Sequence, residues 1–380
     1  MKYKIPFNKP FIVGKELHYI SQAVLSGKIS GDGIFTRKCQ KYLEEQMGAK
    51  KVLLTHSCTA ALEMSAILCG IEKGDEVIIP SYTFVSTANA FYLRGADIKF
   101  VDIREDNLNI DESKIEQLIT EKTKVIVPVH YGGISCEMDK IMELAKQYEL
   151  KIIEDAAQGL GAKYKGIPLG TIGDFGTISF HETKNVISGE GGAIVINNEE
   201  HIERAEIIWE KGTNRKKFYR GEVDKYTWVD VGSSFLPSDI VAAFLYAQLE
   251  NIDFINNKRK MLFENYYNGL KVLEDDGILK LPYGSNKCDG SYHIFYIILN
   301  DNQTRDDLMG FLKNKGILSV FHYIPLHLSP VGRKMGYSDG DLPITEDLSW
   351  KLLRLPLFFE LNFNDQEDII REIKEFFNYK

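Results

Sequence analysis

Short apolar runs alternate with helical segments between about residue 50 and residue 196, and this alternation limits the possible folds more than any other feature. The runs have the length and composition of strands, and the intervals between them have the apolar periodicity of helices. Strands separated by helices form βαβ units, which build a mostly parallel sheet covered by helices. We therefore predict an α/β fold with strands at 51–54, 76–79, 98–102, 124–129, 151–153, 177–180 and 193–196, and helices at 59–69, 84–93 and 137–148.

The pattern changes near residue 235. The stretch 237–265 is largely helical in pattern, with Ala242, Leu245 and Leu249 on one face. After it we predict strands at 291–299 and 317–321 and helices at 305–315 and 365–377. A chain of 380 residues is long enough for two domains. We predict a large α/β domain over 1–245, which includes the N-terminal segment, and a smaller α+β domain over 246–380.

Charge and cysteine content exclude several classes of partner. The formal net charge is −8 and no long Lys/Arg block occurs, so neither nucleic acid nor a membrane is an expected partner. A local pocket for a small anion remains compatible with this charge. The five cysteines are scattered, so we predict no disulfide framework and no metal site. The N-terminus shows no signal peptide and no run reaches the ~18 apolar residues of a membrane span, so we expect a cytoplasmic protein.

Polar residues follow two of the predicted strands. Ligands in open α/β sheets bind beyond the carboxyl ends of the strands, which makes these residues candidates for a site. Ser57, Cys58 and Thr59 begin a helix, where free N–H groups and hydroxyls suit a phosphate; a plain helix cap is the alternative. Asp155 ends the strand at 151–153 and could reach a bound ring, or form a turn or a cap instead.

A lysine follows a third strand, in the stretch SFHETKNVISGEGGAI. Lys184 taken alone is an ordinary lysine, because most lysines keep the ammonium in water. The glycines after it match neither a P-loop nor a dinucleotide fingerprint, so they shape the backbone. A phosphate-type helix start, a carboxylate and a lysine are what pyridoxal phosphate (PLP) needs for its phosphate, its ring nitrogen and its aldehyde. We therefore predict PLP as the cofactor, with pyridoxamine phosphate (PMP) as its intermediate form.

The order of these elements resembles the DegT/StrS sugar aminotransferases, which have the type I fold of PLP enzymes. The resemblance covers nearly the whole chain, and it is closest to the branch that makes TDP-4-amino-4,6-dideoxygalactose from a TDP-4-keto-6-deoxy sugar. The matching stretches are IPFNKP, SGKISGDGIFTRKCQ, KVLLTHSCTAALEM, PSYTFVSTANAF, VPVHYGG, EDAAQ, SFHETKN with GEGGA, EKGTNR, VDKYTWVDVGSS, VFHYIPLH and LLRLPLF.

The resemblance implies roles around the reacting part of the cofactor. Lys184 would form the Schiff base and then move the proton of the transamination. Asp155 would pair with the ring nitrogen, and Gln158 would lie near the 3-hydroxyl. Phe84 would stack on the ring, although packing in the core is the alternative. Some relatives have histidine at the lysine position and remove oxygen instead, so Lys184 implies transamination.

The resemblance also implies a phosphate site and a homodimer with shared active sites. Ser179 would hold the phosphate together with Ser57, Cys58 and Thr59. Many members have Gly-Thr where this chain has Cys58-Thr59, a change that keeps the backbone donors. Many also use an asparagine to reach the phosphate in the neighbouring subunit. Here Ser234 is the candidate for that contact, with a shorter reach or through a bridging water.

The substrates follow from the same resemblance. L-glutamate is the expected amino donor and leaves as 2-oxoglutarate. The expected acceptor is TDP-4-keto-6-deoxy-D-glucose and the product TDP-4-amino-4,6-dideoxy-D-galactose, for surface polysaccharide biosynthesis. Transfer to C3 or to another nucleotide sugar is the alternative, and a non-catalytic binder with the same fold is a further one. The presence of Lys184 argues against the binder.

Several further residues are candidates for substrate contacts. The diphosphate of a nucleotide sugar needs cations, and the irregular segment 212–234 and the residue before it supply them; a solvated loop is the alternative. Two histidines and a tyrosine in VFHYIPLH would contact the sugar or the donor, or support the structure. No physical role is predicted for His181 and Glu182. The candidate substrate residues are Lys211, Arg215, Arg220, Lys225, His322, Tyr323 and His327.

Overall fold

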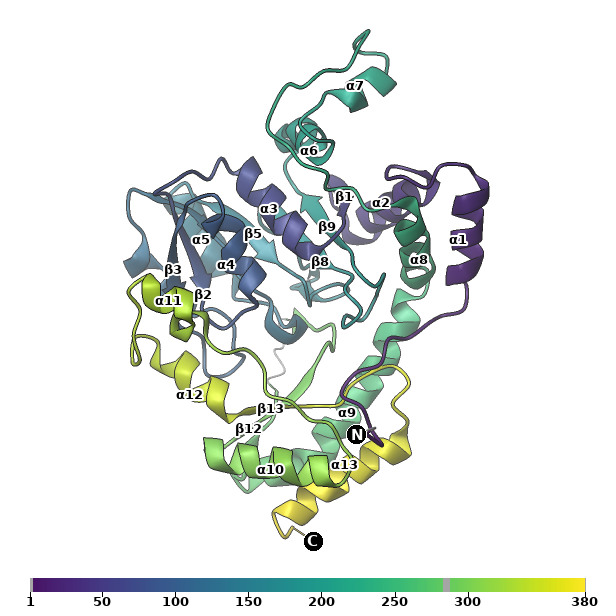
Figure 1. The fold of residues 1–380 in the computed structure, drawn as a ribbon. Coiled ribbons are helices and arrows are strands. Elements are labelled where there is room, and N and C mark those ends of the chain that lie inside the picture. The colour runs from purple at the N-terminus through teal and green to yellow at the C-terminus, as the bar shows by residue number, and fades with distance from the viewer. Residues whose placement is uncertain (1–2, 283–287, 380) are drawn as a thin grey trace.

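The computed structural model describes residues 3–282 and 288–379, and a seven-stranded sheet is its central element (Figure 1). In spatial order the strands are β1 (Lys51–Thr55), β9 (Gly192–Ile196), β8 (Phe175–Ser179), β5 (Lys151–Asp155), β4 (Thr123–Ile126), β2 (Glu76–Pro80) and β3 (Asp97–Val101). The pairs from β8 to β3 are parallel, whereas β9 runs antiparallel to both β8 and β1. The predicted mostly parallel sheet is therefore confirmed.

Helices cover both faces of this sheet, as a sheet of continuous apolar strands requires. One face packs against α3 (Cys58–Leu68), α4 (Val85–Tyr92) and α6 (Ile202–Trp209). The other face packs against α2 (Ile34–Met47), α5 (Met138–Gln147) and α8 (Asp239–Leu249). An outer helix, α1 (Glu16–Leu25), lies against α8. The short strands β6 (Lys163–Tyr164), β7 (Ile167–Pro168) and β11 (Cys288–Asp289) form a separate small sheet.

A second sheet and its helices form the C-terminal part, at the bottom of Figure 1. Its strands are β10 (Leu279–Lys280), β12 (Phe295–Leu299) and β13 (Leu352–Leu355). The long helix α9 (Ile252–Asp275) packs here with α10 (Asn302–Asn314) and α13 (Phe363–Phe376) around one apolar cluster. Two further helices are α11 (Pro330–Lys334) and α12 (Pro343–Lys351).

The division of the chain at residue 245 stays a prediction. It falls within α8, which contacts α1 and α2 of the N-terminal part, whereas α9 contacts α13. The stretch 237–265, predicted as largely helical, contains α8 and most of α9, with a break at Glu250 and Asn251.

The predicted strand at 317–321 is wrong. Ile317 pairs only with Ile5, and Val320 only with Arg354, in isolated bridges. Because the two bridges go to different segments, no continuous ladder forms. The segment 212–234 is irregular as predicted, apart from the short helix α7 (Arg215–Tyr219), and it projects beyond α6 at the top of Figure 1. No helix in the described residues combines the length and the apolar character needed to cross a membrane.

Candidate active site

A cavity of about 530 Å³ opens at the carboxyl ends of the parallel strands. This volume is typical of a pocket for a small molecule. Residues of the central sheet, the N-terminal segment and the C-terminal part all line it. It brings together ten of the residues predicted from the sequence: Ser57, Cys58, Thr59, Phe84, Asp155, Gln158, Ser179, Lys184, His322 and Tyr323.

Lys184 lies half-buried in the cavity wall, in the turn after β8. Its backbone N–H donates to the carbonyl of His181 at 2.9 Å, which closes this turn. Burial lowers the pKa of the Lys184 amine below its ordinary value of 10.5, and the positive charge of Arg354 lowers it further, while Cys58 and Asp155 act in the opposite direction. Burial therefore increases the fraction of neutral amine, the form that reacts with a carbonyl group.

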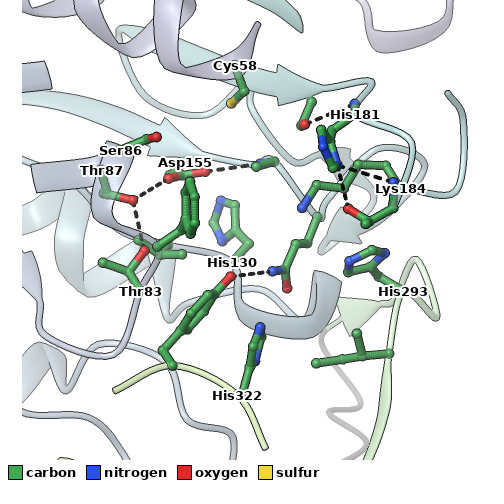
Figure 2. A pocket seen from close by; sticks show the side chains of 18 of the residues that line it. Cys58, Thr83, Ser86, Thr87, His130, Asp155, His181, Lys184, His293 and His322 are labelled. Carbon is green, nitrogen blue, oxygen red and sulfur yellow. Dashed lines mark hydrogen bonds between the residues drawn. The ribbon is translucent and has the colours of Figure 1, made fainter. Parts of the chain in front are cut away.

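Asp155 lies at the end of β5, buried and across the cavity from Lys184 (Figure 2). Its Oδ2 accepts from the Thr87 hydroxyl at 2.8 Å, and its Oδ1 accepts from the Ala157 N–H at 3.1 Å. Thr83 in turn bonds to Thr87, at 2.8 Å between the hydroxyls. Both donors to the carboxylate are neutral, and a buried carboxylate is strongly stabilised by a cation. The site is thus suited to a ligand with a protonated ring nitrogen.

Hydroxyl and backbone donors gather at the start of α3. The Ser57 hydroxyl accepts from the Ala60 N–H at 3.1 Å, so Ser57 caps the helix. The Thr59 hydroxyl lies 2.7 Å from that of Ser86, and the buried Ser179 lines the same side of the cavity. Free N–H groups and hydroxyls at the start of a helix favour an anion such as phosphate.

A glycine permits this helix start to lie against the sheet. A Cβ atom built on Gly192, the first residue of β9, would lie 2.4 Å from the backbone nitrogen of Cys58. No side chain fits in that space, so GEGGA keeps the phosphate-type helix start in place.

Two further predicted cofactor residues, Gln158 and Phe84, lie on the side of the cavity that faces the C-terminal part. Gln158 accepts from the Gly132 N–H at 2.7 Å and donates to the Tyr323 hydroxyl at 3.1 Å. Phe84 is 57% exposed, so its ring lies in the cavity wall and the alternative of core packing does not apply. Tyr323 stacks on His322, with ring centroids 3.7 Å apart.

Sequence reasoning missed several residues of the site, among them Thr83, Ser86, Thr87 and His130. The same strand-end rule could have found them, because Thr83, Ser86 and Thr87 follow β2 and His130 follows β4. His130 is fully buried; its Nδ1 accepts from the Cys136 N–H at 3.2 Å. Its Nε2 therefore carries the proton and donates to Glu154 at 3.0 Å.

Ser234 and the four predicted cations lie outside this cavity. Ser234 is exposed and pairs with Glu210 in a β-bridge. Lys211 and Arg215 bind the Glu210 carboxylate, at 3.5 and 2.9 Å. Arg220 binds Glu206 and Glu222, and Lys225 is exposed. Within one chain, the projecting segment thus contributes no residue to the lining of the cavity.

His327 also lies outside the cavity. Its position agrees with the alternative that this residue supports the structure and does not contact substrate. It is fully buried, with Nδ1 2.7 Å from the Ser81 hydroxyl and Nε2 3.0 Å from Glu346. Of the two residues without a predicted role, His181 lines the cavity and bonds to the Thr183 hydroxyl at 2.9 Å, whereas Glu182 is exposed.

The fold and the cavity together define a class of protein. A mostly parallel α/β sheet that presents a phosphate-type helix start, a buried carboxylate and a lysine at its strand ends is the type I fold of PLP enzymes. The donor set and the space kept by Gly192 fit this cofactor.

Comparisons with known proteins give the family. The model of the DegT/DnrJ/EryC1/StrS aminotransferase family matches residues 10–374, and the chain belongs to this family. The chain is 33% identical to the GDP-perosamine synthase of Escherichia coli O157:H7 over 386 residues, which cover 100% of both chains. It is also 33% identical to the UDP-4-amino-4-deoxy-L-arabinose–oxoglutarate aminotransferase of Shewanella sediminis (strain HAW-EB3), over 98% of this chain and 97% of that one.

A solved structure supports the cofactor. The protein Spr1654 of Streptococcus pneumoniae matches with a TM-score of 0.90 and 27% identity over 98% of both chains, and its structures include a PLP form and a PMP form. The predictions of a sugar aminotransferase and of PLP are thereby confirmed at the level of the family.

Proposed function

We propose that this protein transfers an amino group from an amino acid to a nucleotide-linked keto sugar, with PLP held in the cavity. The observation that carries the proposal is the convergence of Lys184, Asp155 and the start of α3 on one cavity. Each group comes from the end of a different strand of the same sheet, so the geometry depends on the sheet itself.

The residues of the cavity would hold the cofactor at four places. Ser57, Cys58, Thr59 and Ser179 would bind the phosphate through hydroxyls and N–H groups. Asp155 would bind the ring nitrogen, Gln158 the 3-hydroxyl, and Phe84 one face of the ring. All of these residues line the cavity, and Phe84 is largely exposed there, which supports the assignments.

PLP supplies an aldehyde that can carry an amino group and a ring that can hold an electron pair. Lys184 would provide the amine that holds the cofactor, and its Nζ would hold and move a proton. A free amine is needed for both tasks, and the lowered pKa of Lys184 increases its fraction near neutral pH. Gln158 and Tyr323 line the same cavity, and the hydrogen bond between them holds both side chains in place.

The proposed substrates are L-glutamate and TDP-4-keto-6-deoxy-D-glucose, with TDP-4-amino-4,6-dideoxy-D-galactose as product. The support is the resemblance to the branch that carries out this reaction. GDP and UDP sugars are the alternatives, since the two enzymes compared above are named for a GDP and a UDP sugar. Transfer to C3 is a further alternative, because substrate orientation decides it.

We propose a homodimer in the cytoplasm. Large apolar side chains are exposed on α1 and on the projecting segment, including Leu17 (79%), Leu25 (85%) and Trp228 (79%), and such surfaces commonly mark an interface. In a dimer, Ser234 and the four cations of the segment could reach the cavity of the partner. Sedimentation velocity tests the dimer, and a monomer at micromolar concentration would contradict it.

Product analysis tests the function. PLP-loaded enzyme is incubated with L-glutamate and, separately, with the 4-keto-6-deoxy sugars of TDP, GDP and UDP. We expect one amino sugar and one 2-oxoglutarate per turnover, fastest with the TDP sugar, and NMR of the product assigns C4 or C3. The Lys184→Ala variant is expected to lose at least about a thousandfold in turnover. Absence of turnover with every keto sugar would contradict the proposal.

A further inference from the structure

His293, just before β12, lines the cavity but has no part in the proposed cofactor contacts. It is 8% exposed, and with Lys184 it also lines a second cavity of about 10 Å³, close to the space of one water molecule. The charge of Lys184 acts on the His293 ring. Figure 2 shows both side chains on the same side of the large cavity. The ring and the lysine amine are therefore close neighbours.

The amide of Asn185, the residue after Lys184, determines which nitrogen of His293 carries a proton. Its Nδ2 donates to the carbonyl oxygen of Ser291 at 2.8 Å and to Oδ1 of Asn256 at 3.0 Å. A backbone carbonyl only accepts, so the orientation of the amide follows from its partners, and its Oδ1 faces Nδ1 of His293 at 3.0 Å. An amide oxygen cannot donate, so Nδ1 of His293 is the donor in this hydrogen bond.

The other ring nitrogen, Nε2 of His293, is left as an acceptor. Burial lowers the pKa of His293 well below the ordinary 6.5, and the positive charges of Lys184, Arg259 and Arg354 lower it further. The ring is therefore neutral near pH 7, and Nε2 carries a lone pair. Within the described part of the chain, the bond to Asn185 is the one hydrogen bond of this ring. A buried acceptor without a partner gains strongly from a charged donor.

We propose that Nε2 of His293 accepts a hydrogen bond from Nζ of Lys184 when this amine carries the transferred proton. His293 is then a positioning residue for the proton transfer, and the inference rests on the proposed aminotransfer. The Lys184 amine takes a proton from a substrate carbon, becomes an ammonium and later gives the proton up, while His293 stays neutral. An ammonium has three N–H donors, so one can bind Nε2 while another carries the transferred proton. The contacts of Asn185 tie the lysine turn to α9 and to the segment before β12, which holds the amine near the ring.

Two substitutions of His293 separate the roles of its two nitrogens. Asparagine places an amide nitrogen where Nδ1 lies, so His293→Asn keeps a donor to Asn185 and removes the acceptor at Nε2. Glutamine places an amide oxygen where Nε2 lies, so His293→Gln keeps the acceptor and removes the donor.

The half-reaction with saturating L-glutamate, followed by the cofactor absorbance, should slow about 10- to 100-fold in His293→Asn, from the loss of a charged hydrogen bond. In His293→Gln it should slow by less than about fivefold, and both KM values should stay within about threefold in both variants. L-glutamate deuterated at the α-carbon should give a larger kinetic isotope effect in His293→Asn, because proton transfer then limits the rate more strongly.

The pKa of the Lys184 amine gives a readout without turnover. In the PMP form this amine is free, and its labelling by acetic anhydride at a series of pH values is quantified by mass spectrometry of the Lys184 peptide. A neutral acceptor stabilises the ammonium, so His293→Asn should lower the pKa of Lys184 by about one unit or more. His293→Gln should leave this pKa within about half a unit. The control His18→Asn changes an exposed histidine of α1 and should alter neither the rate nor the pKa. Circular dichroism and the cofactor absorbance confirm that each variant is folded and loaded.

The outcomes separate this inference from the proposed function. If wild-type enzyme is not converted by L-glutamate, the proposed donor is wrong, and the labelling experiment still decides the contact between His293 and Lys184. If His293→Asn keeps either the wild-type rate or the wild-type pKa of Lys184, the inference is overturned. A larger loss in His293→Gln than in His293→Asn would also overturn it, because the ring would then act through Asn185 alone. A rise confined to the KM for the sugar nucleotide would do the same, because Nε2 would then bind a sugar hydroxyl.

Discussion

The cavity and the projecting segment 211–234 both contain lysine and arginine side chains, but the pKa values of these side chains shift in opposite directions in the two regions. In the cavity, burial lowers the pKa of Lys184 and of Arg354, and neither has a carboxylate at ion-pair distance within the described residues. On the segment, hydrogen bonds to Tyr219 and Glu210 raise the pKa of Arg215, and bonds to Glu206 and Glu222 raise that of Arg220. Lys184 and Arg354 thus remain available to a ligand, whereas Arg215 and Arg220 already have partners within the chain.

The chemistry of this protein is expected in the cavity and not on the segment. A desolvated, unpaired cation gains most from an anion, and a paired surface cation gains least. A desolvated lysine is more often the neutral amine, which is the form that reacts with a carbonyl compound. Changes in the cavity should therefore alter catalysis and cofactor binding strongly. Changes on the segment should alter them little, unless the segment reaches the cavity of a partner.

Asp155→Asn should have a large effect, second only to that of Lys184→Ala. The amide keeps the shape of the side chain but cannot stabilise a protonated ring nitrogen, and we expect turnover to fall about 100- to 1000-fold. Steady-state kinetics with saturating PLP measure this. The matched control is Asp139→Asn, an exposed residue of α5. A fall of less than about tenfold would indicate that Asp155 is only a structural residue at the end of β5.

Gly192→Ala should weaken the cofactor site itself. The added Cβ would lie 2.4 Å from the Cys58 nitrogen and displace the start of α3. We expect the dissociation constant of PLP to rise about tenfold or more, as for the loss of a charged hydrogen bond. Titration of the apoenzyme with PLP measures it. In the control Gly310→Ala, on α10, the new Cβ would meet no atom within 4 Å other than its chain neighbours and the backbone of its own helix, and an unchanged constant is expected.

The buried histidines should make stability depend on pH. His322 and His293 have pKa values well below 6.5, so the folded state stays neutral where the unfolded chain takes up protons. The free energy of unfolding should therefore fall as the pH drops below about 6.5, by up to about 1.4 kcal/mol per pH unit for each histidine. His322→Gln should reduce this slope in urea unfolding between pH 5 and 7. The exposed His18→Gln should leave it unchanged; an unaltered slope in both variants would count against a neutral His322.

Arg220→Gln should have the smallest effect. Its ion pairs are on the surface, where such pairs contribute about 0–1 kcal/mol. We expect the free energy of unfolding to change by less than about 1 kcal/mol and the affinity for PLP to stay the same. Urea unfolding and PLP titration check both values. A tenfold weaker PLP site would show that the segment supports the cavity after all.

The strand-end rule explains why much of the site could be predicted from the sequence. Asp155 and Lys184 follow strands with clear apolar runs, and parallel strands carry their carboxyl ends to one edge. The same rule reaches His130 and Thr87 when it is applied to two more strands. Because these positions depend on local patterns and on one sheet, a single sequence is enough to place them.

Other parts depend on how distant segments meet, which local patterns do not encode. Ile317 and Val320 have strand-like neighbours, but their partners Ile5 and Arg354 lie in two different segments. In the sequence, Arg354 is one residue of the strand-like stretch LLRLPLF, and no local pattern indicates a cavity there. It lines the cavity because the C-terminal part packs against it. His327 lies five residues after His322, yet only His322 faces the cavity.

Identification of the residue that binds the cofactor tests the role of Lys184 most directly. PLP-loaded protein is reduced with borohydride, digested, and the modified peptide is mapped by mass spectrometry. We expect a pyridoxyl group on Lys184 and on no other lysine, with Lys211 of the projecting segment as the internal comparison. A pyridoxyl group on a different residue, or none in protein that contains PLP, would contradict it.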